Sequence, residues 1–177
     1  TWGTGGPRSG TYGYVISNHA YGSLLSDYVT ASPNTVYNVS AWVRGEIDAD
    51  DSEYGGWTIE LCSYKADNTY LNCQTSASGG PGTISTSWQQ KSGAVTTPAN
   101  TGKVRIRLYL WYSAGWAAYD DVSLTQGGGG NLVVNPGFES SGNWTEGRNT
   151  AFPGTSFWRG TWGTGARTST GMSLRVF

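Results

Sequence analysis

Two stretches of the sequence alternate between apolar residues and a mixture of aromatic and arginine residues. In KVRIRLYLWY (103–112) the apolar residues are Val104, Ile106, Leu108 and Leu110, and the residues between them are Arg105, Arg107, Tyr109 and Trp111. In VYNVSAWVR (36–44) the residues on the corresponding second face end in Trp42 and Arg44. Because successive side chains of a strand point to opposite faces, one face of each strand is expected to pack a core. The other carries rings and guanidinium groups, which suit ligand contact better than simple solvation.

Tryptophan and tyrosine dominate the aromatic content, with nine Trp and eleven Tyr against four Phe. Both rings are amphipathic, so this excess indicates aromatic faces at a wet surface as well as in a core. Charged residues make up 13% of the chain and the net charge is −1. This composition argues against a nucleic acid or an anionic membrane as partner, and no apolar run reaches membrane-spanning length. His19 is the only histidine, which argues against a histidine-rich metal centre.

The two cysteines fall at facing positions of a predicted hairpin. Tyr54–Lys65 and Tyr70–Thr75 are expected strands around the turn Ala66-Asp67-Asn68-Thr69. If Lys65 faces Tyr70, counting outward places Tyr64 opposite Leu71, Ser63 opposite Asn72, and Cys62 opposite Cys73. Facing residues are close enough for a disulfide, although two free, half-buried thiols are the alternative. A disulfide fits a chain rich in Gly, Ser and Thr that is expected to be a mature secreted, extracellular segment.

Short strands are predicted along almost the whole chain, separated by Gly, Pro, Asn and Ser. They are Tyr12–Ser17, Ser23–Tyr28, Val36–Arg44, Tyr54–Tyr64, Tyr70–Thr75, Trp88–Thr97, Lys103–Trp111, Ala117–Thr125, Asn131–Val134 and Ser173–Phe177. This spacing is typical of an antiparallel sandwich or barrel.

The two ends of the chain repeat each other. Segment 161–177 duplicates 1–17: both contain Thr-Trp-Gly-Thr-Gly followed by an arginine and a short strand-like stretch. The chain is therefore expected to be out of phase with its own repeat unit. Residues 1–126 form the main body of the predicted module, and 127–130 are four glycines, expected to be a flexible linker. Residues 131–177 are expected to supply the opening strand or strands.

Three motifs of the sequence resemble those of a known protein family. Asn131–Glu139 (NLVVNPGFE), followed by Trp144, resembles the opening of bacterial carbohydrate-binding modules of the family 4/9, 16 and 22 jelly-roll group. Tyr119–Leu124 (YDDVSL) is similar to the strand that closes them, and Thr35–Arg44 to a central strand. The order is inverted here, because the closing motif precedes the opening one. The resemblance therefore implies an all-β jelly-roll sandwich of two antiparallel sheets, circularly permuted or cut out of phase with a tandem repeat.

In modules of this group one concave sheet grips a polysaccharide, and the resemblance implies the same here. Trp and Tyr rings stack on the apolar face of a sugar, while Arg, Gln and Asn bind its hydroxyl rim. The candidate ligand-binding residues are Trp111, Tyr109, Arg107, Trp42, Arg44, Gln90, Trp2 and Trp162. For Trp42 and Trp111 the alternative is structural cover under a loop.

The resemblance also implies a structural Ca²⁺ between the opening and closing strands. Glu139 and Asp120 match its carboxylate ligands, with carbonyl groups near Ser9–Gly10 or Thr170–Gly171 completing the shell. Asp120 is expected to share the inward face of Val122 and Leu124 and so to need a partner. An ordinary capping or salt-bridge pair is the alternative.

The function expected from these features is non-catalytic binding of a plant-type polysaccharide (β-glucan, xylan or mannan) by an ancillary module of a secreted glycoside hydrolase. A structural or adhesive surface repeat is the first alternative. A glycoside hydrolase is the second, but it needs two carboxylates across a cleft, and only Glu60 lies near the aromatic strand. Because two near-identical segments compete for one strand position, we also expect a domain-swapped dimer.

Overall fold

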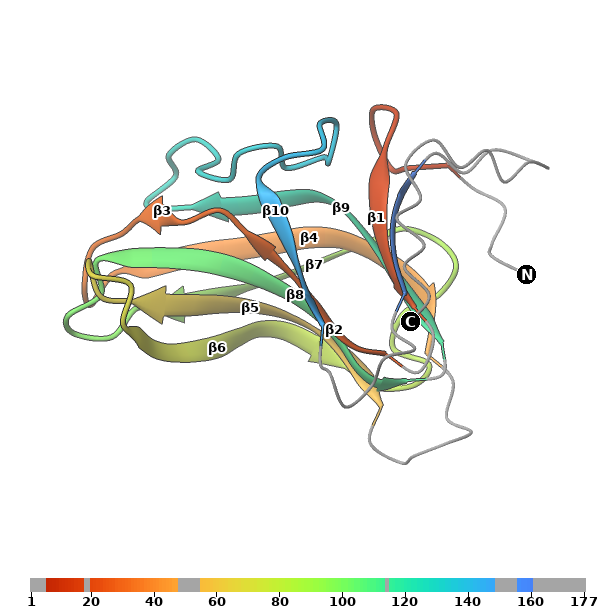
Figure 1. Cartoon of the computed structure of the whole chain (residues 1–177), viewed down its shortest axis with the longest axis horizontal. Coiled ribbons are helices and arrows are strands. Elements are labelled where there is room, and N and C mark those ends of the chain that lie inside the picture. The colour runs from red at the N-terminus through yellow and green to blue at the C-terminus, as the bar shows by residue number, and fades with distance from the viewer. Residues whose placement is uncertain (1–5, 18–19, 48–54, 114, 149–155, 161–177) are drawn as a thin grey trace.

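The computed structural model describes residues 6–17, 20–47, 55–113, 115–148 and 156–160, which form eleven strands in two sheets (Figure 1). The first, here the β4 sheet, has the order β11 (Ser156–Gly160), β1 (Gly13–Ser17), β9 (Trp116–Thr125), β4 (Val36–Glu46) and β7 (Gln89–Thr96). The second, the β8 sheet, has the order β10 (Trp144–Arg148), β2 (Ala20–Ser26), β8 (Lys103–Ser113), β5 (Gly56–Tyr64) and β6 (Tyr70–Gly79). The short β3 (Val29–Thr30) also pairs with β8.

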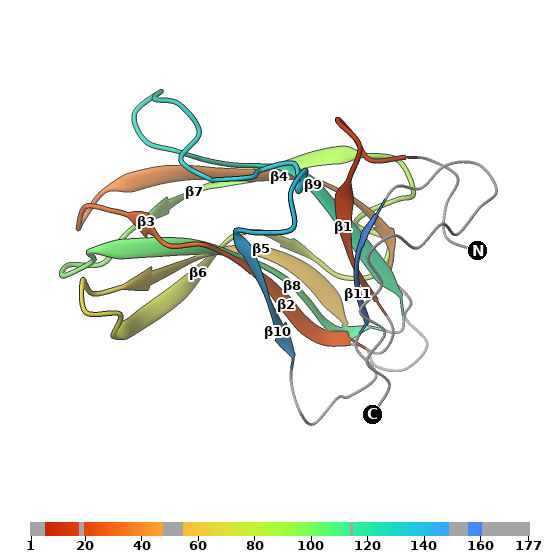
Figure 2. The same ribbon diagram turned by 45° about the horizontal axis from the view of Figure 1, so that its top comes forward.

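The core lies between the two sheets, which Figure 2 shows as stacked layers. Both alternating stretches contribute the residues that the sequence predicts. The buried set from β4 is Tyr37, Val39, Ala41 and Val43, and the set from β8 is Val104, Ile106, Leu108 and Leu110. All neighbouring strands pair antiparallel. The predicted all-β sandwich of two antiparallel sheets is confirmed. No membrane-spanning helix is found in the part of the chain that the structure describes.

The segment after the glycine run returns alongside β9. The Leu132 N–H donates to the Leu124 carbonyl (2.8 Å), and the Val122 N–H donates to the Pro136 carbonyl (2.9 Å). Val133 and Phe138 join the core. The four glycines at 127–130 form a reverse turn, in which Gly127 and Gly128 have φ of 56° and 78° and the Gly129 N–H donates to the Gln126 carbonyl.

Two strands that the sequence did not predict, β10 and β11, complete the sheets. β10 pairs with β2, and β11 pairs with β1. The Tyr14 hydroxyl of β1 donates to Glu146 Oε1 of β10 at 2.5 Å and so links the two layers. β1 belongs to the N-terminal copy of the duplicated segment, and it lies between β9 and β11. The predicted strand Ser173–Phe177 lies outside the described residues.

The β5–β6 hairpin carries a disulfide between Cys62 and Cys73, which face each other across the two strands. The pairing nearer the turn differs from the sequence expectation. Lys65 bonds to Thr69 rather than facing Tyr70, because Asn68 adopts φ of 71° and makes the turn one residue shorter. A bulge at Leu71 then restores the register, so that Ser63 faces Asn72 as expected.

Candidate functional site

The outer face of the β8 sheet brings together three of the predicted ligand-binding residues. Arg107, Tyr109 and Trp111 point outward from β8, and all three are partly exposed. Beside them lies an open pocket of about 590 Å³. Its lining residues are Gly55, Trp57, Thr58, Glu60, Thr75, Ser78, Gly79, Gly80, Pro81, Tyr109 and Trp111. The pocket is thus lined by two aromatic residues of β8, Tyr109 and Trp111, and by two exposed hydroxyl-bearing residues of β6, Thr75 and Ser78.

Glycine allows Trp111 to lie close against β5. Gly56 faces Trp111 across the strand pair. A Cβ on Gly56 would lie 3.2 Å from the Trp111 Nε1 and 2.7 Å from the Gly79 carbonyl oxygen. These two neighbours leave no room for a larger residue at position 56, so glycine there helps to set the position of the Trp111 indole.

An ion pair lies between the pocket and the rest of this face. The Arg107 Nε donates to Glu60 Oε2 at 2.5 Å, and the guanidinium lies 5.0 Å from the centre of the Tyr109 ring. Burial alone would lower the pKa of Arg107, but the hydrogen bond and charge of Glu60 outweigh it and raise that pKa. Glu60 is largely buried and was not among the predicted binding residues. The pair is electrically neutral and still offers oxygen and N–H groups beside Tyr109.

One wall of the pocket is the loop after β6. The Trp57 Nε1 donates to Thr83 Oγ1 at 2.9 Å, and the Thr83 hydroxyl donates to the Gly80 carbonyl at 2.6 Å. Lys91 donates to the Thr83 carbonyl from the neighbouring strand β7. These bonds hold Gly80 and Pro81 against the sandwich, so the wall is supported from the core side.

Trp42 and Arg44 do not share this face, because β4 and β8 belong to different sheets. Trp42 is partly buried, with the Arg8 guanidinium 4.2 Å from its ring centre. Arg44 is 2% exposed and lies over Trp88 at 4.9 Å, and burial lowers its pKa. The expectation of one face shared with Trp111 is therefore wrong, and the Arg8 guanidinium covers part of the Trp42 ring.

The remaining predicted binding residues are also elsewhere. Gln90 is exposed on β7 opposite Trp42, on the outer face of the β4 sheet. Trp2 and Trp162 lie outside the described residues. The structure thus gathers Arg107, Tyr109 and Trp111 and separates them from Trp42, Arg44 and Gln90.

The two predicted calcium ligands, Asp120 and Glu139, both contact the segment that precedes β1. Asp120 Oδ2 accepts the backbone N–H groups of Arg8 (2.8 Å) and Ser9 (3.2 Å). Glu139 Oε1 accepts those of Thr11 (3.0 Å) and Tyr12 (3.1 Å). Distant parts of the chain therefore meet at these carboxylates.

Asp120 is fully buried, but it does not share the face of Val122 and Leu124. Trp42 faces Asp120 while Ser40 faces Ser123, so β9 carries one extra residue between them, and Asp121 has φ of 45°. This bulge turns both aspartates to the outer face, where Asp121 bonds to Ser9 and Arg8. The predicted inward orientation is wrong for this reason.

The surroundings of Asp120 disfavour its charged form. Burial raises the pKa of Asp120 to about 6, although hydrogen bonds from the N–H groups of Ser9, Asp121 and Arg8 lower it. The nearby Asp121 carboxylate also raises this pKa. A bound cation would favour the ionised form of this buried carboxyl group.

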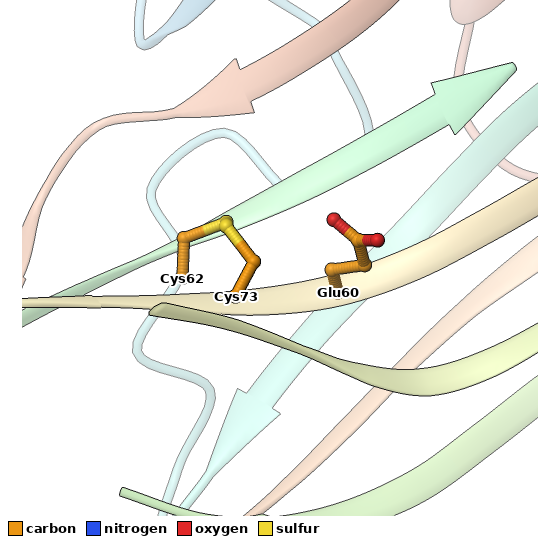
Figure 3. A group of neighbouring side chains, drawn as sticks. All are labelled: Glu60, Cys62 and Cys73. Carbon is orange, nitrogen blue, oxygen red and sulfur yellow. A yellow bond between two sulfur atoms is a disulfide. The ribbon is translucent and has the colours of Figure 1, made fainter. Parts of the chain in front are cut away.

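Among the described residues, the only cluster with three potential metal-binding atoms within 4.8 Å of one another is Glu60, Cys62 and Cys73. Figure 3 shows that both sulfur atoms of this group are joined in the disulfide, beside the Glu60 carboxylate. Sulfur atoms in a disulfide are not thiolates, so the group does not offer a thiolate metal site. Asp120, Asp121 and Glu139 supply hard oxygen ligands, but their oxygens do not converge within this distance.

The fold is similar to solved carbohydrate-binding modules. The PbXyn10C module in its apo form matches with a TM-score of 0.54 and 15% identity, over 88% of this chain and 91% of that chain. A family 16 carbohydrate-binding module, module 2, matches with a TM-score of 0.44 and 24% identity, over 67% and 79%. The C-terminal family 22 module of Clostridium thermocellum Xyn10B matches with a TM-score of 0.45 and 12% identity, over 72% and 77%. At this level of identity the first match shows a shared fold.

No protein-family model matches the chain, and no curated protein matches it.

Proposed function

We propose that this chain is a non-catalytic carbohydrate-binding module that binds a plant-type polysaccharide in the pocket beside Tyr109 and Trp111. The observation that carries the proposal is the composition of this pocket: two outward aromatic side chains on β8 line it together with the exposed hydroxyl-bearing residues Thr75 and Ser78 of β6. A sugar ring has an apolar face and a hydroxyl rim, so rings and hydroxyl groups on one open surface match both of its parts. The fold shared with a carbohydrate-binding module supports the same proposal.

The pocket does not favour the glycoside hydrolase alternative. Its described lining contains one carboxylate, Glu60, which is paired with Arg107. Hydrolysis of a glycosidic bond by the usual route needs a second carboxylate across the cleft and an acid with a raised pKa. We therefore propose binding without catalysis, as in an ancillary module of a secreted enzyme. The disulfide supports the secreted, extracellular location in this proposal.

Affinity electrophoresis against soluble β-glucan, xylan and mannan tests this function. We expect retardation by at least one polymer and no release of reducing sugar. Trp111→Ala should weaken binding by about 2 kcal/mol or more, because truncating a central aromatic contact removes both stacking and desolvation. Val36→Ala is a matched control, since Val36 is 52% exposed on the other sheet and should leave retardation unchanged. Retention of full affinity by a folded Trp111→Ala protein would move the site elsewhere.

We also propose a structural Ca²⁺ held by Asp120 and Glu139, with Asp121 beside them. Hard carboxylate oxygens suit this ion, and the buried Asp120 needs a compensating charge. The carboxylates would have to draw together to share the ion, since they now accept N–H groups of residues 8–12. A cation there would neutralise repulsion between Asp120 and Asp121 and join β9 to the segments before β1 and after the glycine turn.

Thermal unfolding with and without EDTA tests the ion. At a hundredfold excess of calcium over its dissociation constant, binding should stabilise the fold by about 2.7 kcal/mol. Polysaccharide binding should hardly change, because Asp120 and Glu139 are not among the residues that line the pocket. An unchanged melting temperature, with no ion detected by native mass spectrometry, would leave these carboxylates as a plain polar cluster.

A further inference from the structure

The outer face of the β8 sheet carries a second aromatic group at the opposite end of its strands from the pocket. Tyr28, Tyr64 and Tyr70 form a continuous array, with ring centres 5.0 Å apart for the first pair and 5.6 Å for the second. Tyr28 is 42% exposed and Tyr70 is 57% exposed. Each ring is supported by the next, so these exposed rings are held in place rather than isolated on the surface.

Two cations flank this array. The Arg105 guanidinium lies 4.8 Å from the centre of the Tyr28 ring, and the Lys103 ammonium lies 5.8 Å from it. Both come from β8 and precede Arg107 on the same face of the strand, because the three residues occupy alternate positions. We call these five residues, Tyr28, Tyr64, Tyr70, Lys103 and Arg105, the tyrosine–cation patch.

The charges of the patch differ from those beside the pocket. Arg107 is paired with Glu60, so its charge is balanced. Arg105 donates to the Ser26 carbonyl, and Lys103 donates to the Asn68 side-chain oxygen. Within the described parts of the chain, neither of these two cations has a carboxylate partner. The patch therefore combines apolar ring surface with positive charge that neutral oxygens orient but do not neutralise.

We propose that the tyrosine–cation patch is a second contact for the polysaccharide, and that it takes a sugar bearing a carboxylate, such as a uronic acid. The inference rests on the proposed function, since the pocket and the patch share one face of one sheet. Arg105 is six residues from Trp111 along β8, a separation of about 20 Å, so a polymer of several sugars would be needed to reach both. The rings supply the stacking surface for the sugar, and Arg105 and Lys103 supply charged donors for its carboxylate.

Glucuronoxylan and the same polymer with its carboxylates reduced to alcohols test the inference by affinity electrophoresis or calorimetry. We expect the wild-type protein to prefer the acidic polymer at low salt and to lose that preference at high salt. The double variant Lys103→Gln/Arg105→Gln should lose about threefold to tenfold in affinity for the acidic polymer only. The charge-retaining variant Lys103→Arg is the matched control and should keep the preference. Tyr70→Ala should weaken binding of the acidic polymer, whereas Val36→Ala should not.

The outcomes separate this inference from the proposed function. Equal binding of both polymers by the wild-type protein, with Trp111→Ala still removing it, would overturn the second contact and leave the pocket in place. Preference for the acidic polymer that survives in a folded double variant would also overturn it. Failure of the wild-type protein to bind either polymer, or any of the three tested above, would overturn the proposed function together with this inference.

Discussion

At the scale of single residues, two arginines show how surroundings decide what an outward side chain can do. Arg44 lies 2% exposed between Trp88 and Trp116, where aromatic faces balance part of its charge. Arg107 has a side-chain exposure of 32% and is balanced by Glu60. The same alternation of apolar and polar residues predicts an outward side chain for both arginines. Their exposure differs because other segments pack over Arg44 on the β4 sheet, and those segments are distant in sequence.

Asp120 gives a pH dependence at this scale. Its folded-state pKa is about 6, against an ordinary value of 3.8, so between these values the folded protein holds a proton that the unfolded chain has released. In the presence of a chelator, its contribution to the free energy of unfolding should therefore be full below pH 4 and be lost as the pH rises through 6. Urea unfolding from pH 4 to 8 measures this contribution as the free energy of unfolding of the wild type minus that of Asp120→Asn, which should fall as the pH rises. A value that stays constant, or that rises with pH, would contradict this assignment.

At the scale of strands, alternation predicted which side chains share a face but not which strands share a sheet. Arg107, Tyr109 and Trp111 lie together because all three are on β8. Trp42 was expected beside them, but β4 is in the other sheet. Strand order depends on pairing between distant segments, so a single sequence with regular alternation leaves it open.

Bulges account for the other local errors. The extra residue at Asp121 turned Asp120 away from the predicted face, and the one at Leu71 shifted the last hairpin pair. Each bulge accompanies a nearby residue with positive φ, Asp121 itself or Asn68, and these residue types tolerate such backbone. Gly56, the first residue of β5, was the clearest missed signal of the candidate site, because glycine inside a strand often marks a close approach.

Gly56→Ala tests that close approach. The new Cβ would meet the Gly79 carbonyl at 2.7 Å and Trp111 at 3.2 Å, so β5, the loop after β6 or the indole must shift. We expect weaker polysaccharide binding and a changed tryptophan emission spectrum in a protein that still folds. Gly142→Ala is the control, since a Cβ there would have no neighbour within 4 Å. Equal affinity of the two variants would show that the position of Trp111 is not set by Gly56.

At the scale of the whole molecule, the C-terminal part of the described chain completes the body formed by the earlier strands. β10 and β11 add to the edges of the two sheets, and the segment after the glycine turn lies along β9. Together with the inverted order of the opening and closing motifs, this arrangement supports our proposal of a circularly permuted module or one cut out of phase with a tandem repeat. In either case β1, β10 and β11 lie in the same two sheets as the strands between them in the sequence.

The duplication of 1–17 in 161–177 leads to a prediction about association. The N-terminal copy supplies β1 (GYVIS) between β9 and β11, and we expect the strand-like stretch of the second copy (SLRVF, 173–177) to compete for an equivalent position in another chain. Exchange would reproduce the backbone pairing of β1 and join two chains, which is the usual basis of domain swapping. We expect the full chain to form a dimer whose fraction grows with concentration, measured by analytical ultracentrifugation. A chain ending at Gly160 keeps β1 and β11 and should remain a folded monomer with the same affinity for polysaccharide. A full chain that stays monomeric over a wide concentration range, or a truncated chain that still dimerises, would show that the duplicated segment does not mediate association.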